Sequence, residues 1–166
     1  NNLELSSALL NNLIKIKEIN NINFIASFIS IKTEINTKFI NDYLFSLGKK
    51  ICLPVIINNN QDLIFRLYDK KTNLKKGKFG VLEPNENQKE ILPDIILTPC
   101  LAFDNFFYRL GYGGGYYDRT FKKFKKLGHP FISVAVAYDD QKIKKVITDK
   151  NDQKIDFILT EKHLYS

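Results

Sequence analysis

The chain has 166 residues, of which 44% are hydrophobic and 26% are charged, and its formal net charge is +7. This size and composition are those of an ordinary globular protein with a sizeable core, so we expect one domain over residues 1–166. No apolar run approaches the ~20 residues that cross a bilayer, and no signal-peptide pattern opens the chain, so we expect a cytoplasmic protein without a membrane partner.

The positive charge allows two interpretations. A basic surface can bind nucleic acid, but the lysines are spread along the chain, and the densest cluster, at 122–126, forms the polar side of one predicted helix. A solvated helix face is therefore favoured over an RNA-binding surface. A basic surface also suits an anionic small molecule. We expect small-molecule partners, no nucleic-acid partner and a monomer.

The first part of the chain alternates between predicted helices and strands. Apolar residues at helical spacing predict an amphipathic helix over 3–19, and an apolar run predicts a strand over 24–30. Asn36 is placed to cap a helix that runs to Leu47, and Gly48 is placed to end it. Further strands are predicted at 50–54, 63–67, 94–98, 131–137 and 151–161. This alternation predicts an α/β domain with a mostly parallel central sheet covered on both faces.

Several residues that could carry chemistry are given structural interpretations. Cys52 and Cys100 lie at the ends of predicted strands and are expected to be buried thiols rather than a disulfide or metal pair. His129 and His163 have no ligand spacing and are expected on the surface or in loops. Segment 74–84 holds two glycines and ends in Glu-Pro, which predicts a fixed loop and leaves ligand contact open.

A glycine-rich run stands out between Arg109 and Arg119. It holds four of the eight glycines within five positions: Gly111, Gly113, Gly114 and Gly115. A helix is predicted directly after it, with an apolar face formed by Tyr117, Phe121, Phe124 and Leu127. A buried strand over 94–98 precedes the run. Strand, glycine loop and helix form an arrangement in which backbone N–H groups and the helix dipole converge on a phosphate.

The loop matches neither common phosphate motif. No Gly-Lys-Ser/Thr follows it, and Tyr116 stands where a dinucleotide fingerprint needs a small residue. Spacing alone leaves phosphate binding and a structural turn open. Arg109 and Arg119 favour phosphate binding, and Asp118 in the first helical turn can hold magnesium through a hard oxygen. A purely structural role for Asp118 and the adjacent tyrosines remains the alternative.

Two runs carry a resemblance to a known family. Leu101-Ala-Phe-Asp104, followed by Arg109-Leu-Gly-Tyr-Gly-Gly-Gly-Tyr-Tyr-Asp-Arg119, resembles the signature of the 5-formyltetrahydrofolate cyclo-ligase family, also called methenyltetrahydrofolate synthetase. The match extends in order and spacing over residues 32–37, 48–54, 79–84 and 152–161. It departs from the family at Phe107, where glycine is common. A lysine and an arginine that contact ATP near the first helix of family members are not matched.

The resemblance implies a three-layer α/β fold with a mostly parallel central sheet, similar to that of CoA transferases and ribose-5-phosphate isomerase. It implies ATP- and magnesium-dependent conversion of 5-formyltetrahydrofolate to 5,10-methenyltetrahydrofolate, with release of ADP and phosphate. The alternative is a catalytically impaired module that binds nucleotide or folate, which Phe107 and the unmatched basic residues favour. A folded chain that binds these ligands without forming product would identify this alternative.

The resemblance also assigns roles to individual residues. Arg109 becomes the catalytic phosphate clamp, and Asp118 and Asp152 become the magnesium ligands. Position alone favours a turn role for Asp152 and a solvated loop charge for Glu34. The residues implied for ATP binding are Arg109, Leu110, Gly111, Tyr112, Gly113, Gly114, Gly115, Tyr116 and Tyr117. Those implied for folate binding are Ile29, Glu34, Tyr112, Gly113, Gly114, Gly115 and Tyr116.

Overall fold

The computed structural model describes residues 2–166 and is built around a seven-stranded sheet. The strands are β1 (Phe24–Ala26), β2 (Lys50–Val55), β3 (Ile64–Tyr68), β6 (Ile95–Pro99), β9 (Ile132–Val136), β10 (Phe157–Leu159) and β11 (Leu164–Tyr165). Their order is β11-β10-β9-β6-β1-β2-β3. Neighbours from β10 to β2 pair in parallel, whereas β3 and β11 pair antiparallel at the edges. The predicted mostly parallel sheet is confirmed.

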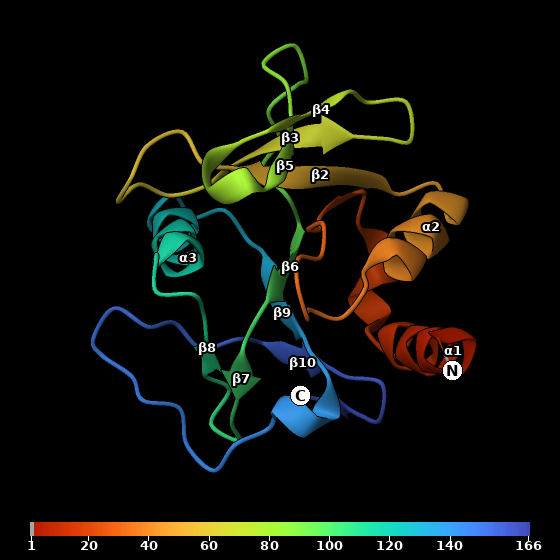
Figure 1. Cartoon of the computed structure of the whole chain (residues 1–166), viewed down its shortest axis with the longest axis vertical. Helices are drawn as coiled ribbons and strands as arrows, with labels where there is room; N and C mark the ends of the chain where they lie inside the picture. Colours follow the sequence, from red (N-terminus) through yellow and green to blue (C-terminus); the bar gives the residue numbers. More distant parts are fainter. Residues whose placement is uncertain (1) are drawn as a thin grey trace.

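Helices cover both faces of this sheet. They are α1 (Asn2–Leu13), α2 (Lys38–Ser46) and α3 (Tyr116–Lys126). Figure 1 shows α1 and α2 on one face of the sheet and α3 on the other. The architecture is therefore three-layered, as expected. No described helix is long and apolar enough to cross a membrane.

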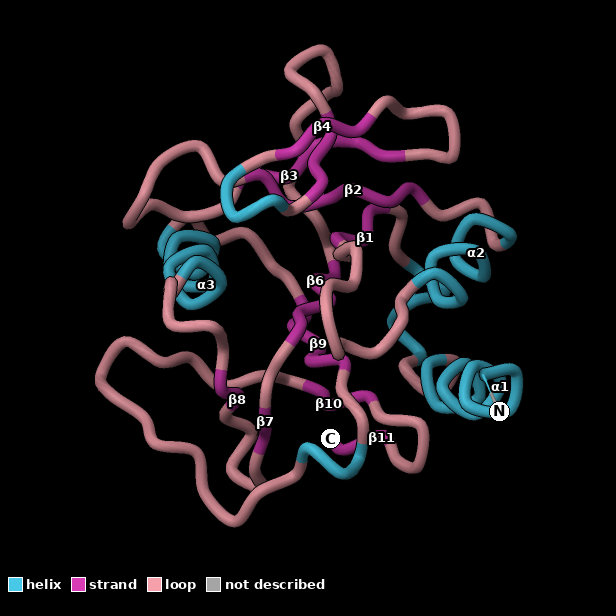
Figure 2. The backbone as a smooth tube through the Cα atoms, in the orientation of Figure 1, coloured by secondary structure: helices cyan, strands magenta, loops and turns pink. Residues whose placement is uncertain are grey.

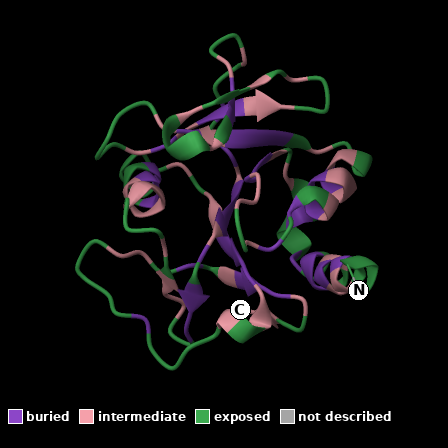
Figure 3. Ribbon diagram, in the orientation of Figure 1, coloured by how far each residue is buried: buried purple, intermediate pink, exposed green. Residues whose placement is uncertain are grey.

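The two faces of the central strands build two separate cores, because successive strand side chains point to opposite faces. In β6, Ile95 and Leu97 belong to the core beneath α1 and α2, whereas Ile96 belongs to the core beneath α3. The latter core contains Phe121 and Phe124 of α3. Figure 3 shows the buried strands at the centre and exposed residues on the outer loops.

The first predicted helix is shorter than its apolar pattern indicates. The prediction of one helix over 3–19 is wrong, because α1 ends at Leu13 and a 3₁₀ turn, η1 (Lys17–Asn21), follows. Between them the chain bends, and Ile16 and Ile19 both enter the core at 1% and 5% exposure. Burial of these two side chains therefore overrides the helical period. The predicted strand over 24–30 is likewise reduced to β1.

The predicted α2 helix is confirmed, and its boundaries are shifted slightly from the predicted ones. It begins at Lys38, and the Asn36 side chain accepts a hydrogen bond of 2.9 Å from the Lys38 backbone N–H. At its other end Gly48 has φ +73°. The N–H groups of Gly48 and Lys49 donate to Phe45 and Leu44 carbonyls, which closes the helix in a Schellman motif.

Two short hairpins were not predicted. Segment 74–84 was expected to be a fixed loop, but it forms a hairpin of β4 (Leu74–Lys76) and β5 (Leu82–Pro84) around the turn η2 (Lys78–Gly80). A second hairpin, β7 (Ala102–Phe103) with β8 (Arg109–Leu110), stands between β6 and the glycine loop. The predicted strand–loop–helix unit is therefore interrupted by this second hairpin.

The C-terminal part contains much loop and two short strands. Figure 2 shows the long loop that separates the turn η3 (Asp139–Gln141) from β10. The strand predicted over 151–161 is reduced to β10, and β11 was not predicted. Cys52 and Cys100 are free and buried, which confirms their interpretation as thiols inside the fold.

Candidate active site

Two segments that leave the carboxyl ends of adjacent parallel strands meet at one edge of the sheet. Residues 27–37 follow β1, and residues 100–115 follow β6, which pairs with β1 in parallel. This edge is where ligands bind in open α/β sheets. The side chains of Glu34 and Tyr112 come together there, one from each segment. The family resemblance implied both residues for the folate site, whereas position alone favoured a solvated loop charge for Glu34.

The segment after β1 is held in a compact loop by side-chain hydrogen bonds. The Thr37 hydroxyl donates to the Phe28 carbonyl at 2.6 Å, and the Ser30 hydroxyl donates to the Ile35 carbonyl at 2.6 Å. The Ile31 N–H donates to the Glu34 carboxylate at 2.8 Å. The loop therefore fixes Glu34 in place. Ile29, the other predicted folate contact of this loop, is half-buried.

Burial shifts the pKa values of the two side chains that meet at this edge, Glu34 and Tyr112. It raises the pKa of Glu34, although the Ile31 N–H and the Tyr112 hydroxyl oppose the shift by hydrogen bonding to the carboxylate. Desolvation, followed by the adjacent Glu34, raises the pKa of Tyr112 to about 12. A partly buried carboxylate with a raised pKa is a candidate for recognising N–H groups of a ligand, because such donors restore the solvation that it has lost.

The β7–β8 hairpin that precedes the glycine loop is organised around Asp104. This carboxylate is 1% exposed and accepts from the N–H groups of Phe106 and Tyr108, at 2.9 and 3.1 Å, and of Val146, at 2.8 Å. Phe107 has φ +67°, in the left-handed region that favours glycine. The phenylalanine that departs from the family pattern therefore adopts a conformation natural to glycine, while its ring packs on the α3 core.

Arg109 lies in β8 with its guanidinium turned inward. Its Nη1 donates to the Pro99 carbonyl at 3.4 Å, and its Cζ lies 5.1 Å from the centre of the Tyr117 ring. Its Nε is buried and has no hydrogen-bond partner in the described chain. A buried donor without a partner is costly, and a ligand oxygen can satisfy it. The unpartnered Nε makes Arg109 a candidate for binding an anion.

The loop requires glycine at these positions for two different reasons. Gly113 and Gly115 have φ values of +92° and +68°, which glycine adopts without strain. Gly114 has an ordinary φ, but a Cβ there would lie 2.6 Å from the ring of Tyr116. Gly115 is also the residue before α3, and this helix starts without a side-chain cap. Its first N–H groups and its dipole therefore suit an anion.

Arg119 has a structural role. Its Nη2 donates to the Gly114 carbonyl at 2.7 Å, its Nε donates to the Gln61 carbonyl at 3.0 Å, and its Cζ lies 4.9 Å from the centre of the Tyr116 ring. These contacts occupy the guanidinium with the protein itself. Arg119 thus fixes the glycine loop, whereas the Nε of Arg109 has no hydrogen-bond partner in the described chain.

The two predicted magnesium ligands are linked through one backbone group. Asp118 accepts a hydrogen bond of 3.0 Å from the N–H of Gln153, the residue next to Asp152. Asp152 itself accepts from the Asp149 N–H at 2.7 Å, so it also closes a turn. No cluster of three or more metal-binding side chains occurs among residues 2–166. Two carboxylates nevertheless fit magnesium, which commonly takes its other ligands from water and phosphate.

Comparison with known proteins identifies the family. The model of the 5-formyltetrahydrofolate cyclo-ligase family matches residues 1–161. The chain belongs to this family. The cyclo-ligase of Haemophilus influenzae is 36% identical over 85% of this chain and 75% of its own length. The cyclo-ligase of Escherichia coli K12 is 30% identical over 82% of this chain and 76% of its own length.

A solved structure gives the same result for the fold. The 5,10-methenyltetrahydrofolate synthetase of Aquifex aeolicus has a TM-score of 0.79 to this chain at 30% sequence identity. The alignment covers 96% of this chain and 79% of that protein. The resemblance inferred from the glycine-rich run is therefore confirmed for the family and for the α/β architecture.

For a cyclo-ligase of this family, the structure also places beside the candidate site two residues to which the sequence assigned no ligand contact. Phe79, at the tip of the β4–β5 hairpin, meets the Tyr116 ring edge-on at a centroid distance of 6.4 Å and is 77% exposed. Burial raises the pKa of the Cys100 thiol to about 12, and the charges of Arg109 and Glu34 shift this pKa in opposite directions. In the sequence, Phe79 begins the 79–84 run that resembles the family, and Cys100 is interpreted only as a buried thiol.

Proposed function

We propose that the chain catalyses the ATP- and magnesium-dependent conversion of 5-formyltetrahydrofolate to 5,10-methenyltetrahydrofolate, with release of ADP and phosphate. Membership of the cyclo-ligase family supports this reaction. The observation that carries the proposal is the buried, unpartnered Nε of Arg109 beside the glycine loop. We further propose that the enzyme acts as a cytoplasmic monomer on these small molecules.

The reaction needs charge neutralisation and alignment more than acid–base chemistry. The formyl oxygen attacks the γ-phosphorus of ATP, ADP leaves, and the formyl oxygen becomes part of a phosphate leaving group. The neighbouring folate nitrogen then attacks the formyl carbon and loses its proton to solvent, and the carbon–oxygen bond breaks to release phosphate. The enzyme gains most by holding the two substrates in line and stabilising the charge on the transferred phosphoryl group.

We assign the phosphate side of this task to Arg109, the glycine loop and the start of α3. The Arg109 guanidinium offers a forked set of donors, and the loop glycines let backbone N–H groups approach phosphate oxygens. Asp118 and Asp152 would hold magnesium, which supplies neutralisation of the charge on the nucleotide phosphates. The first turn of α3 adds its dipole to the same place.

We assign the folate side to the Glu34 loop and the aromatic side chains that face it. Burial raises the pKa of Glu34, and N–H donors of the pterin ring would restore part of the solvation that its carboxylate has lost. Tyr112 and Tyr116 offer faces for the ring, and Ile29 offers an apolar contact. In this arrangement Gly113, Gly114 and Gly115 form the wall shared by the two substrates.

A substrate-dependence experiment tests the proposal. With magnesium and ATP present, ADP release should depend on 5-formyltetrahydrofolate and equal the amount of methenyl product. ADP release that does not depend on the folate would instead indicate a simple ATPase. Binding of both ligands without ADP release would identify the impaired binding module and overturn the proposed reaction.

A further inference from the structure

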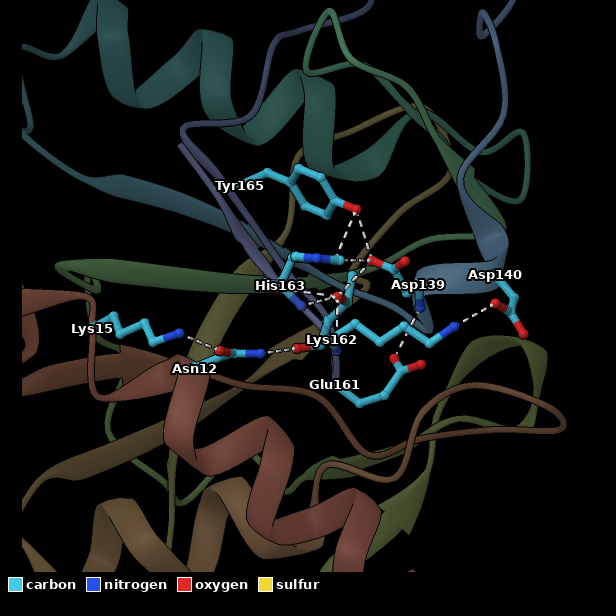
Figure 4. Close-up of polar contacts among 9 residues, drawn as sticks. Asn12, Lys15, Asp139, Asp140, Glu161, Lys162, His163 and Tyr165 are labelled. Atoms are coloured by element: carbon cyan, nitrogen blue, oxygen red, sulfur yellow. Dashed lines mark hydrogen bonds and ion pairs between the residues drawn. The ribbon is translucent and has the colours of Figure 1, made fainter.

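The C-terminal hairpin is fastened to the turn η3 through one carboxylate. Figure 4 shows Asp139 among the polar groups of this region. Its Oδ1 accepts from the Tyr165 hydroxyl at 2.7 Å, from the Thr160 hydroxyl at 2.9 Å and from His163 Nδ1 at 3.1 Å. The Asp139 N–H donates to the Glu161 carboxylate at 2.9 Å. Because Thr160 is fully buried, Asp139 joins the turn to the interior of the fold.

The last residue of the same turn reaches the segment that follows β6. The Gln141 side-chain amide donates to the carbonyls of Cys100 and Leu101, at 2.9 and 3.1 Å, and its oxygen accepts from the Tyr138 N–H at 2.7 Å. Both the NH₂ group and the oxygen of the Gln141 amide therefore take part in hydrogen bonds. These hydrogen bonds connect the backbone at 100–101 to the η3 turn, which Asp139 holds against the C-terminal hairpin.

This contact continues along the hairpin that carries Arg109. The Ile143 N–H donates to the Phe103 carbonyl at 2.8 Å, and Phe103 of β7 pairs directly with Arg109 of β8. The Tyr165 ring packs on the Phe103 ring at a centroid distance of 5.6 Å. The C-terminal hairpin and the segment directly after η3 therefore both contact β7, which pairs with the Arg109 strand.

The Arg109 side chain has few contacts of its own to set its position. Its one hydrogen bond within the described chain is the long contact of 3.4 Å to the Pro99 carbonyl, and it otherwise lies on the Tyr117 ring. Pro99 directly precedes the two carbonyls that Gln141 holds. A guanidinium with so few hydrogen bonds depends on the backbone around it for its position, and small displacements of such groups reduce catalysis strongly.

We propose that Asp139 and Gln141 are positioning residues for Arg109. Asp139 fixes η3 on the C-terminal hairpin, and Gln141 fixes the backbone at 99–101 on which the Arg109 guanidinium rests. The inference deepens the proposed function, because it rests on Arg109 as the phosphate clamp. It assigns a catalytic effect to a turn and a C-terminal hairpin that contribute no group to the reacting atoms.

A double-mutant cycle separates positioning from a general loss of stability. Gln141→Met removes both ends of the amide while keeping a side chain of similar length. We expect it to lower kcat/KM for ATP about tenfold in the wild-type background, and less than about twofold in an Arg109→Ala background. Equal losses in both backgrounds would overturn the inference. Should Gln141→Met not fold, Gln141→Asn, which is too short to span the same groups, replaces it.

Asp140→Ala is the matched control. Asp140 lies in the same turn, its side chain is 87% exposed, and its ion pair is with Lys162 at 3.0 Å. It has no contact with the carbonyls that Gln141 holds. We expect wild-type kinetics for this variant. A tenfold loss in Asp140→Ala as well would show that any disturbance of η3 matters and would contradict the specific role of Gln141.

An NMR measurement tests the positioning without any turnover. The chain has three arginines, Arg66, Arg109 and Arg119, so the Nε–H signals can be assigned with single lysine variants. The Arg109 signal should shift in Gln141→Met and stay in place in Asp140→Ala. An unchanged signal in Gln141→Met would overturn the inference. A shifted signal in a chain that forms no methenyl product would keep the positioning and overturn the proposed function instead.

Discussion

The Asp118 carboxylate accepts a hydrogen bond of 3.0 Å from the backbone N–H of Gln153. This bond holds the start of α3 against the turn that contains Asp152, although the two carboxylates are far apart in sequence. The arrangement gives the predicted magnesium pair a structural basis, because the donor directly follows the second carboxylate in the chain. Through this bond the turn that contains Asp152 lies against the start of α3, where Asp152 can contribute to the candidate magnesium site.

We predict that Asp118→Asn raises the magnesium concentration needed for half-maximal rate by about tenfold, since a carboxylate ligand is replaced by a neutral amide. Initial rates measured over a magnesium titration check this. The control is Asp62→Asn, which removes the ion pair to Lys123 on the same helix and should leave the titration unchanged. A wild-type titration for Asp118→Asn would contradict ligation by Asp118.

Glu34→Gln should stabilise the free protein and weaken folate binding. Burial raises the Glu34 pKa above its usual 4.5, so the ionised group opposes folding at neutral pH. The stability associated with its protonation is complete below pH 4.5 and is lost as the pH rises through the folded-state pKa. The variant should therefore unfold at a higher temperature than wild type at pH 7, and this difference should shrink below pH 4.5.

Binding supplies the second half of this prediction. Loss of a charge-assisted hydrogen bond to the pterin should weaken 5-formyltetrahydrofolate about tenfold or more in calorimetric titration. Glu18→Gln, at an exposed position of η1, should change neither quantity. If Glu34→Gln bound folate as tightly as wild type, Glu34 would not contact the ligand.

Substitution of two glycines should separate binding from stability. Gly114→Ala introduces a Cβ 2.6 Å from the Tyr116 ring in an exposed loop, so ATP binding should weaken while the unfolding temperature changes little. Gly48→Ala forces a left-handed residue with φ +73° into an open site. It should cost about 1 kcal/mol of unfolding free energy and leave ATP binding intact. The reverse pattern would contradict a cradle formed by the glycine loop.

The Asp139 carboxylate should contribute an acid-sensitive part of the stability. Burial alone would raise its pKa, but hydrogen bonds from Tyr165, His163 and Thr160 outweigh burial and lower the pKa below its usual 3.8. Its contribution is thus present above pH 3.8 and is lost as the pH falls through the lower folded-state pKa. Lys162, Asp140 and Glu161 also lie around this group.

Chemical unfolding at two pH values checks this contribution. Asp139→Asn should lose about 2 kcal/mol at pH 7, where wild type has an ionised acceptor, and less at a pH below 3.8. Asp140→Asn, at an exposed position, should lose little at either pH. An equal loss for Asp139→Asn at both pH values would show that the charge of Asp139 does not contribute.

The sequence predicted the parts of the site that are local in the chain. The glycine run, the following helix and the strand before it are continuous segments, and their periodicity or composition is sufficient to find them. The β7–β8 hairpin and β11 escaped prediction because each strand has two residues and so shows no alternation. Likewise, the bend after α1 depends on burial of Ile16, which a helical pattern cannot reveal.

The parts of the candidate site that the sequence did not predict depend on tertiary contacts. The meeting of Glu34 with Tyr112 depends on the parallel pairing of β1 with β6, and the roles of Asp139 and Gln141 depend on how the C-terminal hairpin closes. The two arginines of the glycine run looked alike in sequence. Arg119 is occupied by protein carbonyls, whereas the Arg109 Nε has no partner, and the fold alone distinguishes them.

The central claim is tested most directly by the absorbance of the methenyl product. The chain is mixed with 5-formyltetrahydrofolate and magnesium, with ATP present or withheld, and Arg109→Ala is measured alongside. We predict growth of the product band only with ATP, and a rate lower by about two to three orders of magnitude in Arg109→Ala. A folded wild-type chain that produces no band with ATP, or an Arg109→Ala variant with the wild-type rate, would contradict the account.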